Sequence, residues 1–417
     1  MRMFSYKNGE FYAEDVPVSE IADQVGTPCY VYSYKFIEDT YNEYKEAFSK
    51  IEPIICYSAK ANSNLSILKV FSSLDCGFDI VSVGELKKVL KIGADPKKIV
   101  FSGVGKTKEE IIAATRAEIL FFNVESVDEL EFINEIAISI EKKARISLRV
   151  NPNINPKTHP YISTGFKKSK FGIEINKAFE VYKDCVNKQG LQVVGIDAHI
   201  GSQIFEITPF IDSLIKLIEL ADRLLNEGLN IQYIDIGGGL GIKYENDEQP
   251  LSKTKFANAI IKELNGKPYK IVLEPGRSLI GNGGIMLTRV LYNKIGTEKK
   301  FIIIDAAMND LIRPAFYDSY HEIVTAKQNN SNKDIFDIVG PICESGDFLA
   351  KDRQFPSVSK DDLLVVKSAG AYGFVMSCNY NSRPRVAEVF VKGDKYFTIK
   401  QRESFEDLIK GEEVVDF

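Results

Sequence analysis

Short β-rich apolar runs alternate with amphipathic helical stretches along the chain up to residue 276. Eight such runs predict eight strands: Ile54–Tyr57, Phe78–Val81, Ile99–Phe101, Ile119–Phe122, Ile146–Val150, Val193–Ala198, Tyr233–Ile236 and Ile271–Leu273. Helical patterns between them include Ser66–Phe71, Val83–Ile92, Lys108–Ala114, Val127–Ala137 and Phe210–Leu225. A strand followed by a helix, repeated eight times, predicts an α/β fold of the (β/α)8 barrel type, with an open doubly wound sheet as the alternative.

Polar residues at the ends of the predicted strands favour the barrel over the open sheet. One such residue lies at or just after the C-terminal end of each strand: Lys60, Asp79, Ser102, Asn123, Asn151, His199, Gly237 and Glu274. Barrel enzymes collect their catalytic side chains at this rim. The longer segment after the fifth strand, residues 151–172, contains three prolines and the basic run 167–170. We expect it to be a mobile loop over the site, although a charge run also suits a solvated surface.

The pattern changes after Gly276, where predicted strands follow one another without helices between them. These strands are Gly284–Tyr292, Phe301–Asp305, Ile335–Val339, Leu363–Lys367, Val386–Lys392 and Lys395–Ile399. They predict a separate all-β domain over residues 279–417, after a barrel domain over residues 29–278. Residues 1–28 also look β-like, and we expect this N-terminal segment to join the β domain.

Composition and charge exclude several classes of protein. A length of 417 residues allows two or three domains, and the net charge of -5 lacks the basic footprint of a nucleic-acid-binding protein. No apolar stretch is long enough to span a bilayer, and the N-terminus lacks a signal-peptide core. The six cysteines are dispersed without a CxxC pair, as expected of reduced thiols. We therefore expect a soluble cytoplasmic protein.

Lys60 is the most informative of the rim residues. The apolar stretch 53–57 precedes it, and Asn62, Ser63 and Asn64 follow as turn and helix-cap residues. Desolvation beside apolar neighbours destabilises an ammonium group and favours the neutral amine that a Schiff base requires. Enzymes that use pyridoxal phosphate (PLP) need such an amine, although most lysines at a strand end are simply solvated.

Three motifs follow the last three predicted strands. His199, in the run 199–203, is either a rim residue or a hydrogen-bonded core histidine. The consecutive glycines 237–239 let backbone N–H groups converge on a phosphate, or else form a tight turn. In the run 274–277, Glu274 could face a ring nitrogen and Arg277 could bind a substrate carboxylate bidentately, with an internal ion pair as the alternative.

Two other segments need separate interpretation. The run 102–107 resembles the end of a P-loop, but Val100 occupies the position of an essential glycine, so this is not a P-loop. In the predicted β domain, Cys343 stands beside Glu344 in a run bracketed by turn residues, which makes this cysteine a candidate for chemistry. Two loop-like segments nearby add an arginine and two tyrosines, namely Arg313, Tyr317 and Tyr372.

Read in order, these motifs resemble the diaminopimelate decarboxylase family of fold-type III PLP enzymes, which are related to ornithine and arginine decarboxylases and to alanine racemase. The matching motifs are 57–62, 199–203, 237–239, 274–277, 343–345 and 370–373, and the resemblance covers nearly the whole chain. It implies a lyase that decarboxylates meso-2,6-diaminopimelate to L-lysine and CO2, the last step of lysine biosynthesis.

The resemblance also implies a role for each matching residue. Lys60 would carry PLP as a Schiff base, and Cys343 would protonate the carbanion that remains after CO2 leaves. Glu274 would keep the pyridine nitrogen protonated, and His199 would stack on the ring. The phosphate would be held by Ser202, Gly238, Gly239, Glu274, Pro275, Gly276, Arg277 and Tyr372. The substrate would meet Arg277, Arg313 and Tyr317 at its distal carboxylate, Glu344 at its distal ammonium, and Tyr372; no metal is implied.

The family pattern supplies Cys343 and Glu344 from the partner subunit, so it implies a homodimer with shared active sites. Three alternatives stay open: a decarboxylase of ornithine, lysine or arginine, an amino-acid racemase, and a non-catalytic PLP-binding protein. The first group typically carries aspartate after the catalytic cysteine and needs no clamp for a distal carboxylate. A racemase needs a second base, and the non-catalytic proteins resemble a lone barrel without a β domain.

Overall fold

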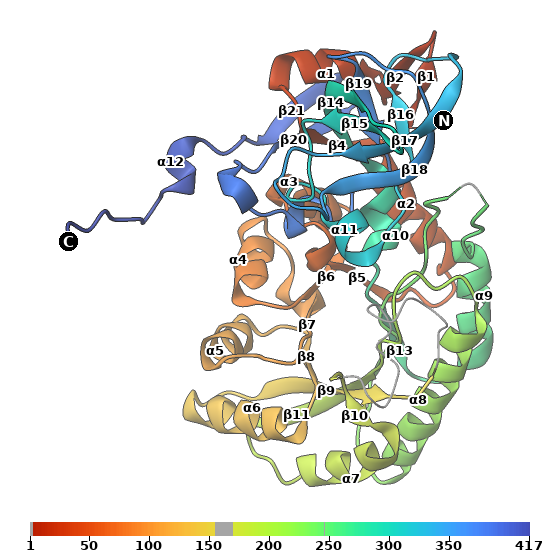
Figure 1. Cartoon of the computed structure of the whole chain (residues 1–417). Coiled ribbons are helices and arrows are strands. Elements are labelled where there is room, and N and C mark those ends of the chain that lie inside the picture. Colours follow the sequence, from red (N-terminus) through yellow and green to blue (C-terminus); the bar gives the residue numbers. More distant parts are fainter. Residues whose placement is uncertain (1–2, 155–169, 246) are drawn as a thin grey trace. The chain divides into compact units, whose positions relative to one another are not determined.

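The computed structural model describes residues 3–154, 170–245 and 247–417, and it divides the chain into two compact units. The barrel unit comprises Glu38–Ile242 and Gln249–Leu279 (Figure 1). The β unit comprises Met1–Ile37, Lys243–Glu248 and Ile280–Phe417. Both units are therefore built from stretches that are separate in the sequence.

Eight parallel strands close into a barrel in the barrel unit. They are β5 (Ile54–Ser58), β6 (Gly77–Ile80), β7 (Ile99–Phe101), β8 (Phe121–Val124), β9 (Ala144–Asn151), β11 (Leu191–Asp197), β12 (Tyr233–Asp235) and β13 (Lys270–Leu273). The ring is closed because β13 pairs with β5 and β8 pairs with β9, while the short β10 (Ile173–Glu174) pairs only with β9. The predicted α/β barrel is confirmed, and the open-sheet alternative is wrong because no edge is left in this ring.

Helices surround these strands on the outside (Figure 1). They are α2 (Tyr34–Ala47), α3 (Leu65–Ser73), α4 (Val83–Lys91), α5 (Lys108–Ala117), α6 (Val127–Ser139), α7 (Ile175–Cys185), α8 (Thr208–Asn226) and α9 (Lys253–Leu264). Polar side chains begin several of them: Ser82 accepts from the Glu85 N–H before α4, and Thr107 forms a capping box with Glu110 before α5. The five predicted helices are confirmed, with small shifts at their ends.

The barrel interior changes character from one end to the other. A cluster of buried apolar side chains contains Cys56, Val100, Leu120, Phe121, Val194 and Val272. Buried polar side chains gather instead at the C-terminal ends of the strands and include Ser58, Asp79, Asn123, Asp197 and Asp235. The C-terminal end is therefore the polar end of the barrel, where barrel enzymes hold their chemistry.

The β unit contains a nine-stranded sheet. Its strands are β4 (Cys29–Ser33), β14 (Gly284–Ile295), β15 (Lys300–Ile304), β16 (Ile323–Thr325), β17 (Lys333–Val339), β18 (Phe348–Pro356), β19 (Leu363–Val366), β20 (Ala387–Lys392) and β21 (Lys395–Lys400). The six predicted strands are confirmed, while β4, β16 and β18 were not predicted. The unit also contains the short helices α11 (Arg313–Tyr317) and α12 (Phe405–Leu408), and α10 (Arg277–Ile280) crosses the boundary between the units.

The N-terminal part of the β unit is longer than predicted. Strands β1 (Phe4–Lys7), β2 (Glu10–Ala13) and β3 (Val16–Pro17) form a separate three-stranded sheet, and helix α1 (Val18–Val25) follows. Their apolar residues join the core of the β unit with Ile285 and Val365. The predicted boundary after residue 28 is too early, because β4 pairs with β14 on one side and with β20 on the other. The β unit therefore extends to Ile37, and its later boundary lies after Leu279, beside the expected residue 278.

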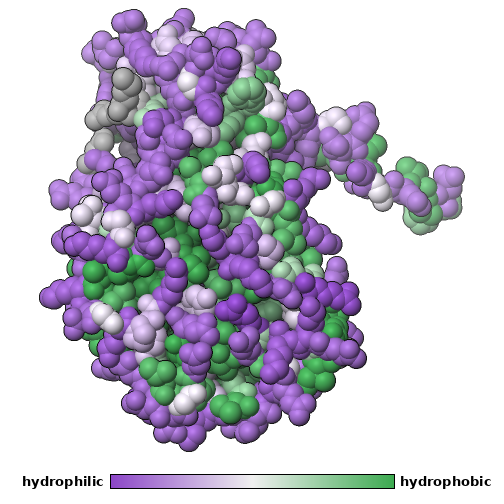
Figure 2. All heavy atoms as spheres, turned by 180° about the vertical axis from the view of Figure 1, so that it is seen from behind, coloured by the Kyte–Doolittle hydropathy of each residue, from purple (hydrophilic) through white to green (hydrophobic). Residues whose placement is uncertain are grey.

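Two further expectations concern surfaces and loops. No helix in the described part of the chain combines the length and apolarity of a membrane span. Figure 2 shows hydrophilic residues interspersed with groups of apolar residues on one face of the molecule. Most of the expected loop 151–172 lies outside the described residues, since 155–169 belong to the gap, so its mobility stays a prediction.

Candidate active site

Lys60 lies in a short 3-10 helix, Ala59–Ala61, directly after β5. Its Nζ donates to Oδ2 of Asp79, on the neighbouring strand β6, at 2.9 Å. The hydroxyl of Ser58 lies 2.8 Å from the same oxygen, because the register of β5 and β6 places Ser58 opposite Asp79. Asp79 is fully buried, whereas 38% of the Lys60 side chain is exposed. The amine is therefore accessible and is held in place by a buried carboxylate.

Glu274 follows β13 and lies buried at the centre of the rim. Its Oε1 accepts from Oγ of Ser102 at 3.3 Å and from Nδ2 of Asn123 at 3.2 Å. Burial raises the pKa of Glu274 to about 7, and the charge of Asp79 adds to the rise, while Lys60 and Arg149 oppose it. This carboxyl group is consequently balanced between its protonated and ionised forms near neutral pH.

Two more buried carboxyl groups stand beside Glu274. One oxygen each of Asp197, Asp235 and Glu274 lie within 4.8 Å of one another. Burial, with the charge of Glu274 as the next cause, raises the pKa of Asp197 and of Asp235 well above the usual value. Asp197 Oδ1 and Asp235 Oδ2 have no hydrogen-bond partner among the described residues. The cluster could by its spacing hold a cation or another group that brings positive charge.

Arg149, on β9, is the buried cation that faces this cluster. Its Nη1 donates to Oε1 of Glu125 at 2.8 Å, and its Nε lies 3.8 Å from Oδ2 of Asp197. Three site residues were not predicted from the sequence: Arg149, Asp197 and Asp235. Each lies inside a predicted apolar strand, where burying an unpaired charge is costly, and this position could have indicated that they pair with one another or with a ligand.

His199 follows β11 and is half-buried. Its Nδ1 accepts from the backbone N–H of Gly238 at 3.2 Å, so a proton on the ring belongs at Nε2. Burial lowers the pKa of His199 well below its usual value, and the charges of Arg149 and Lys60 lower it further. The side chain is therefore a neutral aromatic ring at the rim.

The glycine run after β12 packs tightly against the loops on both sides. A Cβ atom on Gly238 would lie 2.2 Å from the carbonyl oxygen of Glu274, and one on Gly239 would lie 2.3 Å from that of Gly201. Gly237 and Gly239 also have positive φ values of 66° and 109°. The glycines therefore form a tight turn, in which the backbone N–H of Gly238 donates to Nδ1 of His199.

Arg277 and Ser202 meet across the loops that follow β11 and β13. Nε and Nη2 of Arg277 lie 3.4 and 3.2 Å from Oγ of Ser202. The carbonyl oxygen of Pro275 accepts from the backbone N–H of Ser58 at 3.1 Å, which ties the turn 274–277 to β5. The structure thereby groups the predicted residues Lys60, His199, Ser202, Gly238, Gly239, Glu274, Pro275, Gly276 and Arg277 at one end of the barrel unit.

Lys106, in the segment that resembles a P-loop, has a structural role. Its buried Nζ donates to the carbonyl oxygens of Gly103 and Asn123 at 2.7 and 2.8 Å and to Oε1 of Glu129 at 2.7 Å. These contacts join the loop after β7 to β8 and α6. The Lys106 amine is therefore engaged in contacts within the protein, which agrees with the conclusion that this segment is not a P-loop.

The other predicted site residues lie in the β unit. Cys343 and Glu344 are both exposed in the turn after β17, and the Cys343 backbone N–H donates to Oδ1 of Asn381 at 2.9 Å. Tyr317 ends α11, and Tyr372 has a positive φ of 56°. The roles of these residues stay predictions.

Arg313 is the buried member of this set in the β unit. Its Nη1 and Nε2 of His321 lie 3.0 Å apart, and its Nη2 donates to Oγ of Ser319 at 3.2 Å. The guanidinium also lies 4.7 Å from the ring centroid of Tyr244. These contacts hold its planar group in one orientation. Neither His321 nor Tyr244 was singled out from the sequence.

Replacing Glu274 with glutamine should change how stability depends on pH. Because the folded pKa is about 7 and the ordinary value is 4.5, the folded protein retains a proton that the unfolded chain releases between these values. The Glu274 contribution to the free energy of unfolding should therefore fall as the pH rises through this window. Glu274→Gln should remove this loss and stabilise the ligand-free protein at pH 8 by on the order of 3 kcal/mol.

Urea denaturation at pH 5 and pH 8 measures this difference. Glu219→Gln, which changes an exposed glutamate of α8, is the matched control and should leave the pH dependence as it is. An identical pH dependence for Glu274→Gln and wild type would show that the buried carboxyl group is not the source.

Comparison with known proteins connects both units to one group of enzymes. Residues 35–281 match a family model described as pyridoxal-dependent decarboxylase, pyridoxal binding domain. The chain is 48% identical to the diaminopimelate decarboxylase of Pseudomonas aeruginosa over 100% of both chains.

Solved structures give the same result. The diaminopimelate decarboxylase of M. jannaschii, in complex with L-lysine, superposes with a TM-score of 0.94 at 40% identity, covering 99% of this chain and 98% of the other. The enzyme of that name from Helicobacter pylori, also with L-lysine, gives a TM-score of 0.91 at 42% identity, covering 94% and 98%.

Proposed function

The chain belongs to the diaminopimelate decarboxylase family, and from this we propose that it decarboxylates meso-2,6-diaminopimelate to L-lysine and CO2 with pyridoxal phosphate as cofactor. The observation that carries the proposal is that the similarity extends over both units and not over the barrel alone. The reaction is that of a carboxy-lyase and ends lysine biosynthesis. The L-lysine in two related structures is the product of this reaction.

The charged groups at the rim of the barrel unit suit the charges of pyridoxal phosphate. Asp197, Asp235 and Glu274 are crowded carboxyl groups, and two of their oxygens have no partner among the described residues. A ring nitrogen that carries a proton would add a positive charge to that of Arg149, the cation that already faces these three carboxyl groups. An accessible lysine amine and a neutral histidine ring stand at the same rim, as a Schiff base and a stacked aromatic ring require.

Each rim residue then has a definite task toward the cofactor. Lys60 would hold it covalently through Nζ, with Asp79 orienting the amine. Glu274 would keep the proton on the ring nitrogen, and His199 would cover one face of the ring. The phosphate would be held by Ser202, Gly238, Gly239, Pro275, Gly276, Arg277 and Tyr372. When bound, pyridoxal phosphate supplies the electron sink for cleavage of the bond between Cα and the carboxylate.

Residues of the β unit, together with Arg277 of the barrel unit, would select the substrate and complete the reaction. Arg277, Arg313 and Tyr317 would bind the distal carboxylate, Glu344 would bind the distal ammonium, and Tyr372 would contact the substrate. Arg313 supports this assignment because His321, Ser319 and Tyr244 already orient its guanidinium, which suits bidentate binding of a carboxylate. Cys343 would deliver a proton to the substrate carbon, since its exposed turn leaves the thiol accessible.

The test is product formation by the purified protein with and without added pyridoxal phosphate. Meso-diaminopimelate should yield L-lysine and CO2 in equal amounts, and the yield should depend on the cofactor. Ornithine, lysine and arginine serve as competing substrates under the same conditions. Release of CO2 from one of these three, and not from diaminopimelate, would favour a decarboxylase of basic amino acids instead.

We also propose a homodimer in which each active site takes Cys343 and Glu344 from the partner subunit; the cytoplasmic location likewise stays a prediction. Both residues are exposed in the β unit, so they are available to a second subunit. Mixing inactive Lys60→Ala with inactive Cys343→Ala protein should then restore activity. Random exchange makes about half of the dimers mixed, each with one intact site of two, so about a quarter of wild-type activity should return.

A second mixture controls for this result. Lys60→Ala mixed with Glu274→Ala should recover nothing, because both changes affect the barrel unit's share of the site. If the first mixture stays inactive although subunit exchange is demonstrated, each chain builds its site alone.

A further inference from the structure

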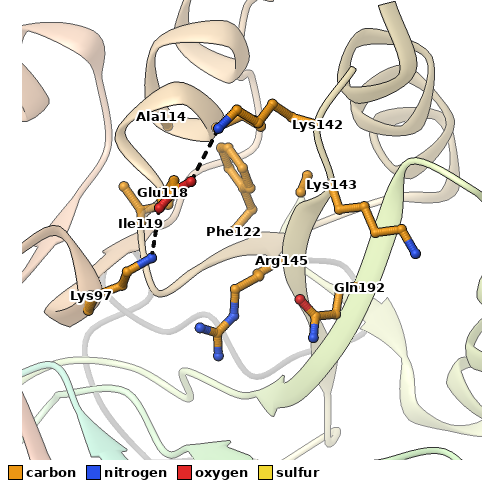
Figure 3. A pocket seen from close by; sticks show the side chains of 11 residues that line it. Lys97, Ala114, Glu118, Ile119, Phe122, Lys142, Lys143, Arg145 and Gln192 are labelled. Carbon is orange, nitrogen blue, oxygen red and sulfur yellow. Dashed lines mark hydrogen bonds and ion pairs between the residues drawn. The ribbon is translucent and has the colours of Figure 1, made fainter. Parts of the chain in front are cut away.

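A cavity lies at the opposite end of the barrel from the candidate active site. It has a volume of about 330 Å³ and lies where strands β7, β8, β9 and β11 begin (Figure 3). Its polar lining consists of Lys97, Thr115, Glu118, Lys142, Lys143, Arg145 and Gln192. We propose that this cavity binds a small metabolite through a phosphoryl group.

The charges of the lining favour an anion. Figure 3 shows Lys97 and Lys142 turned toward Glu118, and their Nζ atoms lie 3.1 and 3.2 Å from its two carboxylate oxygens. One carboxylate thus serves two lysines, while Lys143 and Arg145 form no ion pair within residues 3–154, 170–245 and 247–417. The four cations of the lining exceed its one carboxylate by three charges, and a ligand with several negative charges would offset this excess.

Two buried polar groups of this lining have unmet hydrogen-bonding capacity. Oγ1 of Thr115, a residue of α5 that is only 4% exposed, has no hydrogen-bond partner in the described part of the chain. The same is true of Nε of Arg145. Buried groups of this kind are normally satisfied, and both belong to residues that line this basic cavity.

The geometry suits a phosphoryl group better than a carboxylate. Arg145 and Gln192 are opposed in the register of β9 and β11, and Figure 3 shows their side chains extending side by side. Lys97, Lys142 and Lys143 belong to other segments of the lining. Donors from several directions match the tetrahedral oxygens of a phosphate, whereas a carboxylate offers only two oxygens in one plane.

The rest of the cavity leaves room for a small organic part. Ile119 and Phe122 provide apolar wall, and the volume lies at the lower end of the range for ligand pockets. The guanidinium of Arg145 lies 5.8 Å from the ring centroid of Tyr233, which supports its position from inside the barrel. A small phosphate ester therefore fits, and it would bind without touching the decarboxylation site.

Calorimetric titration of the holoenzyme with inorganic pyrophosphate, at constant ionic strength, tests the proposal. Wild type should show saturable binding that an excess of L-lysine does not displace. Arg145→Gln should weaken binding about tenfold or more, as loss of a charge-assisted hydrogen bond predicts. Glu118→Gln should strengthen it, because it frees two lysines.

Lys91→Gln, at an exposed position of α4, makes the same change in charge and should leave binding as in wild type. Lys143→Gln replaces Arg145→Gln if the latter does not fold, with weaker binding again expected. Any of three results would overturn the proposal: no saturable binding by wild type, displacement of bound pyrophosphate by L-lysine, or equal affinities of Arg145→Gln and Lys91→Gln for pyrophosphate. Citrate in place of pyrophosphate separates the two anion classes, and equal or tighter citrate binding would contradict phosphoryl selectivity.

Discussion

Lys60→Ala should lower kcat by at least about a thousandfold, because the variant loses the amine that positions the cofactor for reaction with the substrate. Wild-type protein with pyridoxal phosphate should show Schiff-base absorbance, and borohydride should fix the cofactor on the peptide that contains residue 60. The variant should show neither signal. Asp79 would remain buried without the cation that now lies 2.9 Å from it, so modest destabilisation should accompany the loss.

Lys69→Ala is the matched control for this experiment. Lys69 is an exposed lysine of α3, close to Lys60 in the sequence, and it donates to the carbonyl oxygen of Ile92 at 3.0 Å. Its replacement should leave activity and borohydride fixation intact. Full activity in Lys60→Ala would refute the assignment of the cofactor lysine.

Cys343→Ala should lower kcat by roughly a hundredfold to ten-thousandfold, the range expected for loss of a general acid. Cofactor absorbance and substrate KM should change little, because the thiol is exposed and its turn is held by a backbone hydrogen bond to Asn381. Steady-state kinetics together with an absorbance titration of pyridoxal phosphate separate the two quantities.

Cys378→Ala controls for loss of an exposed thiol in the same unit. It should retain wild-type kcat. If Cys343→Ala instead loses cofactor affinity in proportion to its loss of rate, the cysteine is structural and another group supplies the proton.

Local patterns in the sequence predicted most of the fold. Runs such as Ile54–Tyr57 have the length and β-branched composition of buried strands, and β5 covers Ile54–Ser58. Strand β18 was not predicted because its middle, residues 351–354, is polar, and the short strand β16 was not predicted either. Residues 29–33, which form β4, fell within the predicted barrel domain, because the sequence of a buried strand does not show which sheet it will join.

The candidate site was predicted where polar residues end apolar runs, as Lys60, His199 and Glu274 do. The same rule did not identify Asp197, Asp235 or Arg149, because each lies within a predicted strand and not at its end. Their importance depends on one another: Asp197 lies 3.8 Å from Arg149, and the carboxyl oxygens of Asp197, Asp235 and Glu274 lie within 4.8 Å.

The strand and helix pattern, the barrel class, the family and the rim position of Lys60 could be predicted from the sequence, because they depend on local periodicity and on motifs of a few residues. The pairing of β4 within the β unit, the raised pKa of Glu274 and the basic cavity at the other end of the barrel could not be predicted, because they depend on tertiary contacts. Burial and electrostatic energies depend on distances between residues far apart in the chain, and folding alone sets those distances.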